Sequence, residues 1–261
     1  MRMQDRARLG AELAGALQRR ELQVVYQPQI RLADGAVSGV EALARWQSPV
    51  LGDVEPENFI PVAEEAGLIG EIGGWVMQTA LAGIQSLAPA PALRLAVNVS
   101  VRQLRDLDFP ARVAGMLGAA AFPPQRLELE ITEGHCLLGE AALDPRIAAL
   151  RRLGVSVVLD DFGAGYSNLA TLGRFDFDRL KLDRSLIRDL HGTIRGERII
   201  EWAVSMASGL GLEVIAEGVE TATQADYLRR IGCTFAQGFL YAPPLTLGEL
   251  ATWLGDRNPM P

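Results

Sequence analysis

Residues 22–46 read LQVVYQPQIRLADGAVSGVEALARW, and this stretch decides how the fold begins. Two apolar runs, 22–30 and 36–46, flank the turn sequence Ala33-Asp34-Gly35. A connection this short joins antiparallel strands, because parallel strands need a longer crossover. The stretch therefore predicts an antiparallel hairpin that opens the main sheet.

After the hairpin, apolar runs alternate with segments of helical spacing. This alternation indicates parallel pairing, and runs that are apolar nearly throughout are typical of strands covered on both faces. Eight strands in one chain of 261 residues predict a single closed (β/α)8 barrel with an antiparallel first strand. The predicted strands are 22–30, 36–46, 93–99, 126–132, 155–160, 178–182, 212–216 and 233–237. The predicted helices are 4–20, 57–66, 71–87, 109–120, 139–152, 166–172, 195–209, 222–231 and 246–254.

Composition and charge narrow the chemistry. Hydrophobic residues make up 49% of the chain, which is enough for a packed core, and the net charge of −7 disfavours long nucleic acid and anionic membrane surfaces as partners. Two cysteines and two histidines are too few for a Cys/His zinc site or a disulfide framework. No apolar run reaches the ~20 residues that span a bilayer, and the first residues contain no signal segment. We therefore expect a cytoplasmic protein.

Polar side chains close the predicted strands. In a (β/α)8 barrel the carboxyl ends of the parallel strands meet at one mouth, where enzymes of this architecture place their chemistry. The polar residues at these ends are Glu41, Arg45, Asn98, Glu130, Glu133, Asp160, Asp161, Lys181, Asp183, Glu217, Glu220 and Gln237. We expect them to converge, although they lie far apart in the sequence.

So many converging carboxylates repel one another unless cations lie among them. Oxygen ligands point to Mg²⁺ or Mn²⁺ rather than to zinc. The adjacent Asp160 and Asp161 could serve two ions, and ions ~3.5–4 Å apart suit in-line displacement at phosphorus. Lys181 adds a mobile cation that suits a phosphate oxygen.

Simpler roles remain open for three of the acidic residues. Asp183 precedes Arg184-Ser185 and Glu220 precedes Thr221-Ala222, and for both acids capping or loop ordering is at least as good an interpretation as chemistry. Glu128 lies two residues from Glu130 on the same strand face, so one of the two could simply be solvated.

The sequence resembles the EAL-domain cyclic di-GMP phosphodiesterases in several motifs that occur in the family's order. The name motif is Glu41-Ala42-Leu43, followed by Arg45-Trp46. The other matching runs are Tyr26-Gln27-Pro28, FIPVAEEAGLI (59–69), VNVS (97–100), LEITE (129–133), DDFGAGYSNL (160–169), LKLDRS (180–185), IAEGVET (215–221) and AQGF (236–239). The resemblance covers about residues 21–254, and its fold is the barrel predicted above.

The resemblance implies a role for each matching residue. Two ions of Mg²⁺ or Mn²⁺ would be held by Glu41, Asn98, Glu130, Asp160 and Asp161. The catalytic set would be Lys181 at the attacking water or phosphate, Glu217 orienting or deprotonating that water, Gln237 supporting the site, and Glu133 and Glu220 positioning the loop after the fifth strand. Cyclic di-GMP, the implied substrate, would contact Gln27, Leu43, Arg45 and Asp183. The expected activity is hydrolysis of one phosphodiester to give linear pGpG.

The family pattern also frames the domain organisation and the alternatives. We expect an N-terminal helix (1–20) packed on the barrel and a phosphodiesterase domain over 21–261, with a homodimer formed through the region after the fifth strand. Departures from the pattern occur at Gly134, Ala164 and Asn168, outside the expected ligand set. The alternatives are a cyclic di-GMP receptor without turnover, which the intact ligand set disfavours, and an unrelated barrel metalloenzyme such as an enolase-like lyase.

Overall fold

The computed structural model describes residues 3–87, 93–132, 143–164, 172, 175–188, 190 and 194–256, and these residues contain a closed barrel. The strands are β1 (Leu22–Arg31), β2 (Val37–Ser48), β3 (Gly52–Val54), β4 (Arg94–Asn98), β5 (Leu127–Thr132), β6 (Ser156–Phe162), β7 (Arg179–Leu182), β8 (Glu213–Ala216) and β9 (Phe235–Ala236). Eight of them follow one another around the ring in the order β1-β2-β4-β5-β6-β7-β8-β9, and β9 pairs back with β1.

The strand directions confirm the predicted fold. β1 pairs antiparallel with both of its neighbours, β2 and β9. The other neighbouring pairs of the ring are parallel. β3 lies outside the ring and extends the hairpin by pairing antiparallel with the end of β2. The mouth formed by the carboxyl ends of the parallel strands therefore also contains the beginning of β1.

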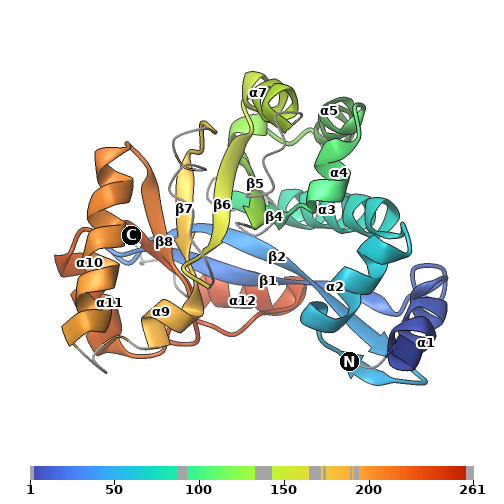
Figure 1. Cartoon of the computed structure of the whole chain (residues 1–261), viewed down its shortest axis with the longest axis horizontal. Helices are drawn as coiled ribbons and strands as arrows, with labels where there is room; N and C mark the ends of the chain where they lie inside the picture. The colour runs from blue at the N-terminus through green and yellow to red at the C-terminus, as the bar shows by residue number, and fades with distance from the viewer. Residues whose placement is uncertain are drawn as a thin grey trace.

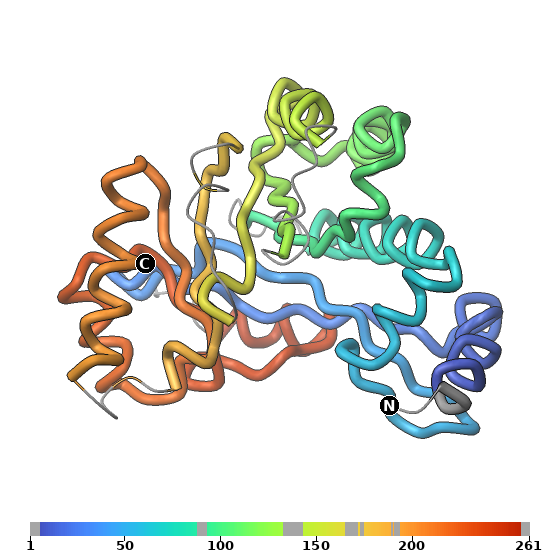
Figure 2. The backbone as a smooth tube through the Cα atoms, in the orientation of Figure 1, coloured from blue at the N-terminus to red at the C-terminus, as the bar shows by residue number. Residues whose placement is uncertain are grey.

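Helices surround the strands, with α3, α5 and α7 on one side of the barrel and α10 and α11 on the other (Figure 1). The helices are α1 (Met3–Leu13), α2 (Pro56–Glu65), α3 (Ile69–Ser86), α4 (Val101–Arg105), α5 (Phe109–Ala119), α7 (Asp144–Arg152), α9 (Arg184–Arg188), α10 (Ile194–Gly209), α11 (Ala222–Arg230) and α12 (Leu247–Asp256). The backbone trace shows α1 and α10 at opposite ends of the molecule's long axis (Figure 2). No helix in these described ranges is long and apolar enough to cross a membrane.

The alternation of side chains along each strand separates an apolar outer face from a polar interior. In β5, Leu127, Leu129 and Ile131 are fully buried in the hydrophobic core, which includes residues from the surrounding helices. Glu128 and Glu130 alternate with them and contact cationic side chains of β7. The barrel interior is therefore a place where charged groups are held out of water.

The structure differs from the sequence prediction mainly in short elements. The predicted helix 4–20 ends at Leu13, because Gly15 adopts a left-handed backbone (φ 89°) and residues 14–20 form turns. β3, α4 and α9 were not predicted, since three to five residues are too few to show a periodicity. Most of the predicted helix 166–172 and the start of 139–152 lie outside the described residues.

The segment after α1 is fastened to the end of β2. Arg19 donates to backbone carbonyls at the end of α1 and forms an ion pair of 2.5 Å with Glu21. The Glu21 carboxylate also accepts a hydrogen bond of 3.0 Å from the Trp46 indole nitrogen. Trp46 is buried and packs edge-on against Phe59 of α2, with ring centroids 5.8 Å apart. These contacts hold α2 and the mouth end of β2 together.

Candidate active site

Six charged side chains, from four strands and the residue after β8, meet at the barrel mouth. We call them the carboxylate cluster: Glu41, Glu130, Asp160, Asp161, Lys181 and Glu217. Strand register explains the meeting, because Asn98 lies opposite Glu130 and Thr132 lies opposite Asp160, so neighbouring strands end at similar heights. The predicted convergence of these residues is what the barrel geometry produces.

Lys181 occupies the middle of the cluster. Its Nζ lies 2.5 Å from Glu217 Oε1, 2.9 Å from Glu130 Oε2, 3.2 Å from Glu41 Oε2 and 3.4 Å from Asp160 Oδ1. Burial alone would lower the pKa of Lys181, but the surrounding carboxylates raise it well above its ordinary value. The side chain is therefore an ammonium ion, and it holds four carboxylates around one point.

Amide side chains fix the orientation of Glu41. Asn98 Nδ2 donates to Glu41 Oε1, and Gln237 Nε2 donates to Glu41 Oε2, both at 2.7 Å. Burial raises the pKa of Glu41, but Lys181 and the hydrogen-bond donors outweigh this and hold it below the ordinary value. Gln237 also donates to Gln27 Oε1 at 2.9 Å, so β1, β2 and β9 are connected here. Glu41 is thus an ionised and rigidly held carboxylate.

The other acids of the cluster have raised pKa values. Burial is the largest cause in each, and neighbouring carboxylates add to it. The pKa of Glu217 rises to about 8 and that of Asp161 to about 6, while the pKa of Glu130 rises well above its usual range and that of Asp160 is also raised. These shifts indicate a cluster that is short of positive charge.

The backbone at the end of β6 turns two consecutive aspartates toward one place. The pairing of β6 with β7 shifts register between Leu159 and Phe162, and Asp161 adopts a left-handed backbone with φ 59°. Aspartate tolerates this conformation better than most residues. Asp161 N donates to Asp160 Oδ1 at 2.8 Å, and carboxylate oxygens of Asp160, Asp161 and Glu217 lie within 4.8 Å of one another. This arrangement offers three anionic oxygens to one ion.

The residues of the cluster fit divalent cations. Five carboxylates face a single ammonium, and burying such an excess of charge is unfavourable unless cations join it. Glu130 Oε1 is buried and has no hydrogen-bond partner among the described residues, so it can accept a further bond inside the site. Carboxylate and amide oxygens are the ligands that Mg²⁺ and Mn²⁺ prefer.

The expected substrate contacts lie at or near the rim of the cluster. Gln27 is buried, and its Nε2 donates to the Ala242 carbonyl at 3.2 Å. Leu43 and Arg45 are half-buried on β2, and burial lowers the pKa of Arg45. Asp183 follows β7, and its Oδ1 accepts a hydrogen bond of 2.9 Å from Ser185 N at the start of α9.

One of the predicted residues, Glu220, is described but is not part of this arrangement. Glu220 is exposed beside α11, whose capping side chain is Thr221, and the described contacts do not bring Glu220 into the cluster. Glu133 lies outside the described residues.

A second charged layer, at the amino ends of the strands, was missed from the sequence. This amino-end layer consists of Arg94, Glu128, Arg179 and Glu213. Arg179 is buried, lies 3.0 Å from Glu128 and 2.7 Å from Glu213, and its guanidinium stacks 4.3 Å from the centroid of the Phe235 ring. Glu128 is buried and ion-paired, so the interpretation that one of Glu128 and Glu130 is solvated is wrong. The sequence contained one indication of this layer, because Arg179 lies two residues before Lys181 and therefore on the same face of β7.

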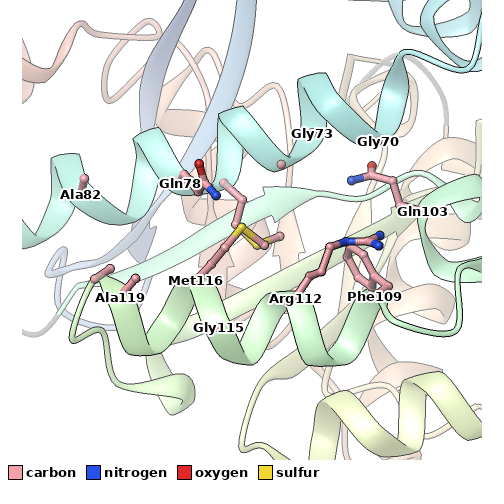
Figure 3. A pocket seen from close by; sticks show the side chains of 13 residues that line it. Gly70, Gly73, Gln78, Ala82, Gln103, Phe109, Arg112, Gly115, Met116 and Ala119 are labelled. Atoms are coloured by element: carbon pink, nitrogen blue, oxygen red, sulfur yellow. The ribbon is translucent and has the colours of Figure 1, made fainter.

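A groove of about 650 Å³ lies on the outside of the barrel, between α3 and α5 (Figure 3). Its walls are mainly glycines, alanines, Met77 and Met116, with Gln78, Gln103 and Arg112 as polar members. Its lining contains none of the cluster residues, so this groove and the candidate active site are separate places.

Comparison with known proteins gives a consistent family. A family model described as the EAL domain matches residues 11–244. Cyclic di-GMP phosphodiesterase NbdA of Pseudomonas aeruginosa is 40% identical over 93% of this chain and 31% of its own length. The chain spans about a third of the length of the curated relatives that it matches.

Solved structures agree with the sequence match. The EAL enzyme Bd1971 in its cAMP- and cyclic di-GMP-bound form superimposes with a TM-score of 0.90 at 29% identity, over 96% of this chain and 69% of the other. The cyclic di-GMP complex of the phosphodiesterase PaMucR superimposes with a TM-score of 0.87 at 36% identity, over 93% and 99%. These matches remove the alternative of an unrelated barrel lyase. A family match over residues 11–244, together with solved EAL structures that share the same barrel, means that the chain belongs to the EAL-domain family.

Proposed function

We propose that this chain is a metal-dependent phosphodiesterase that hydrolyses cyclic di-GMP to linear pGpG. The observation that carries the proposal is the buried cluster of five carboxylates around Lys181 at the mouth of an EAL barrel. The names of relatives support the substrate, since NbdA and two further relatives, PA2567 and PdeR, are called cyclic di-GMP phosphodiesterases.

The proposed substrate also suits the charge of the protein. A cyclic dinucleotide has only two phosphates, so it can be held at one mouth without a basic surface, in agreement with a net charge of −7. The proposed contacts are Gln27, Leu43, Arg45 and Asp183. Arg45 offers a planar guanidinium, which can donate two hydrogen bonds to one phosphate.

Two ions of Mg²⁺ or Mn²⁺ are proposed to bind the oxygens of Glu41, Asn98, Glu130, Asp160 and Asp161. When bound, such ions neutralise phosphate charge and make water a better nucleophile. Asn98 and Gln237 are proposed to keep Glu41 in one orientation, through the hydrogen bonds of 2.7 Å described above. An additional carboxylate, Glu217, shares the space of Asp160 and Asp161 and is available to an ion as well.

The proposed chemistry assigns proton transfer to Glu217 and charge stabilisation to Lys181. Glu217 accepts a proton from the attacking water, and the water oxygen forms a bond to phosphorus. The bond from phosphorus to the 3′ oxygen breaks, and that oxygen takes up a proton, which leaves a 5′ phosphate on linear pGpG. Lys181 donates to a phosphate oxygen as negative charge develops there.

The remaining assignments concern the loop after β6, the oligomeric state, the N-terminal segment and the compartment. Glu133 and Glu220 are proposed to order the loop after β6. We also propose a homodimer through the region after β6 and its neighbouring helices, which is supported by Trp202 and Leu210, large apolar side chains that are about half exposed on and just after α10. Residues 1–20, which include α1 and the turns after it, are proposed as a segment packed on the domain, and the cytoplasm as the compartment.

The competing proposal is a receptor that binds cyclic di-GMP without turnover. Incubation of the protein with cyclic di-GMP and Mn²⁺, followed by chromatography of the products, separates the two. Formation of pGpG that stops when EDTA is added supports the phosphodiesterase. Tight binding of cyclic di-GMP that stays intact after long incubation with Mg²⁺ or Mn²⁺ would favour the receptor.

A further inference from the structure

An ion pair at the barrel mouth plays no part in the chemistry described so far. Arg184 Nη2 lies 2.8 Å from Glu57 Oε1, and both side chains are more than 70% exposed. Arg184 is the first residue of α9, which begins just after β7, and Glu57 lies in the first turn of α2, which follows the β2–β3 hairpin. Both residues are therefore on the rim formed by the carboxyl ends of the strands.

The order of strands places the two partners on opposite sides of that rim. In the ring, β2 and β7 are separated by β4, β5 and β6 in one direction and by β8, β9 and β1 in the other. Three strands on each side make β2 and β7 diametrically opposed in an eight-stranded barrel. The helices that follow them, α2 and α9, lie to the right and to the left along the lower edge of the barrel in Figure 1. The Glu57–Arg184 pair thus bridges the mouth.

Each end of this bridge adjoins the candidate site. Arg184 directly follows Asp183, and its Cβ lies so close to Gly218, the neighbour of Glu217, that a Cβ at Gly218 would be 2.7 Å away. On the other side, Glu55 at the N-cap of α2 acts electrostatically on Arg45 of β2. The Glu57–Arg184 pair therefore lies beside residues expected to contact the cyclic dinucleotide.

We propose that Glu57 and Arg184 form a latch across the mouth, which opens when the dinucleotide enters. The released Arg184 guanidinium then binds the phosphate that is not hydrolysed. The inference rests on the proposed function and adds a substrate contact to it. The chemistry is complementary, because a guanidinium that leaves one carboxylate finds a phosphate with a similar arrangement of oxygens. Glu57 acts only by competing with the substrate for Arg184.

Two variants test the two parts of the proposal. An exposed ion pair contributes about 0.2–1 kcal/mol, which keeps the latch closed for most of the time. Removing the pair in Glu57→Gln therefore lowers KM by about two- to sixfold. Comparison of the double variant Glu57→Gln/Arg184→Gln with Glu57→Gln then measures the contribution of the phosphate contact alone. We expect the double variant to have a KM about tenfold above that of Glu57→Gln, since a hydrogen bond to a charged group is lost.

The matched controls remove a similar ion pair from the other end of α2. Arg6 and Glu65 are also 2.8 Å apart and about half exposed. Glu65→Gln and the double variant with Arg6→Gln remove the same charges without touching the mouth, so KM stays at the wild-type value. Because the latch acts on binding, the changes in the test variants appear in KM more than in kcat.

The outcomes separate this inference from the proposed function. KM that is unchanged or raised in Glu57→Gln overturns the latch, and a double variant equal to Glu57→Gln overturns the phosphate contact. Either result leaves the hydrolysis of cyclic di-GMP by the wild type standing. Dissociation constants for cyclic di-GMP are measured on the same proteins. If the wild type binds cyclic di-GMP without turnover, the proposed reaction is refuted, but the dissociation constants still test the latch. If the wild type does not bind cyclic di-GMP, the proposed function and the latch are both refuted.

Discussion

Replacing Lys181 by methionine removes the only cation in the carboxylate cluster and leaves a side chain of similar length. Lys181 contacts four carboxylates between 2.5 and 3.4 Å and is fully buried. Removing one partner of a buried ion pair costs about 3–5 kcal/mol. In a domain of about this size, 1 kcal/mol shifts Tm by about 2–4 °C, so the metal-free variant should melt roughly 6–20 °C below the wild type. Protonation of Glu217, whose pKa is already raised to about 8, favours the lower half of this range.

Divalent ions should restore much of this loss in Lys181→Met. They supply positive charge to the same carboxylates, and a ligand at about 100 times its Kd stabilises the folded state by about 2.7 kcal/mol. Arg179→Met is the matched control, because Arg179 is an equally buried cation in the amino-end layer. We expect it to lose stability as well, and Mn²⁺ to stabilise both variants by about as much as the wild type, since the gain depends on the affinity for the ion. Thermal melts in EDTA and in Mn²⁺ measure both effects.

Turnover and metal affinity complete the test of Lys181. If the ammonium stabilises charge on the phosphate, kcat falls greatly while Mn²⁺ affinity measured by calorimetry changes little. Loss of Mn²⁺ binding would refute this role and would mean that Lys181 keeps the carboxylates in place for the metal. A Tm in EDTA equal to that of the wild type would refute the electrostatic description of the cluster.

Three further predictions concern the cluster, its ions and the core. Glu41→Ala should abolish hydrolysis and leave the far-ultraviolet circular dichroism unchanged, because β2 pairs through its backbone; retained turnover at saturating Mg²⁺ would contradict this. Ca²⁺ should support binding of cyclic di-GMP but not hydrolysis, since its bonds of ~2.3–2.6 Å displace ligands that Mg²⁺ holds at ~2.0–2.1 Å; brisk pGpG formation with Ca²⁺ alone would count against it. Cys233 is buried and burial raises its thiol pKa to about 12, so in a Cys136→Ser background alkylation at pH 8 should require unfolding; rapid labelling of the native protein would disagree.

The barrel was predictable because its signals are periodic and repeated. The hairpin turn fixed the direction of β1, and apolar strands separated by helices allow few other arrangements. The short α4 and α9 lacked such a signal. α1 ends early because Gly15 adopts a left-handed conformation. The chain has many glycines, and residue type alone does not show which of them adopt this conformation.

The candidate site was predictable as a set of residues but not as a network. Polar residues at strand ends and the family motifs both pointed to Glu41, Lys181 and Glu217. The sequence did not indicate that one ammonium contacts four carboxylates, because these contacts cross the barrel, whereas a local capping role for Asp183 was among its interpretations. The Glu57–Arg184 pair is of the same kind, since its meaning depends on two helices lying on opposite sides of a closed ring.

The two charged layers of the barrel explain why cations belong at one end and not at the other. In the amino-end layer, Arg94 and Arg179 balance Glu128 and Glu213, so the layer is neutral on its own. Among the described residues, the five carboxylates of the cluster meet one cation, Lys181, so the cluster has a net charge of −4 when all are ionised. The central cations of the two layers, Arg179 and Lys181, are equally buried, so burial of the cation does not distinguish the layers. The difference is the charge that two divalent ions would supply, and it lies at the end of the barrel where the EAL motifs converge.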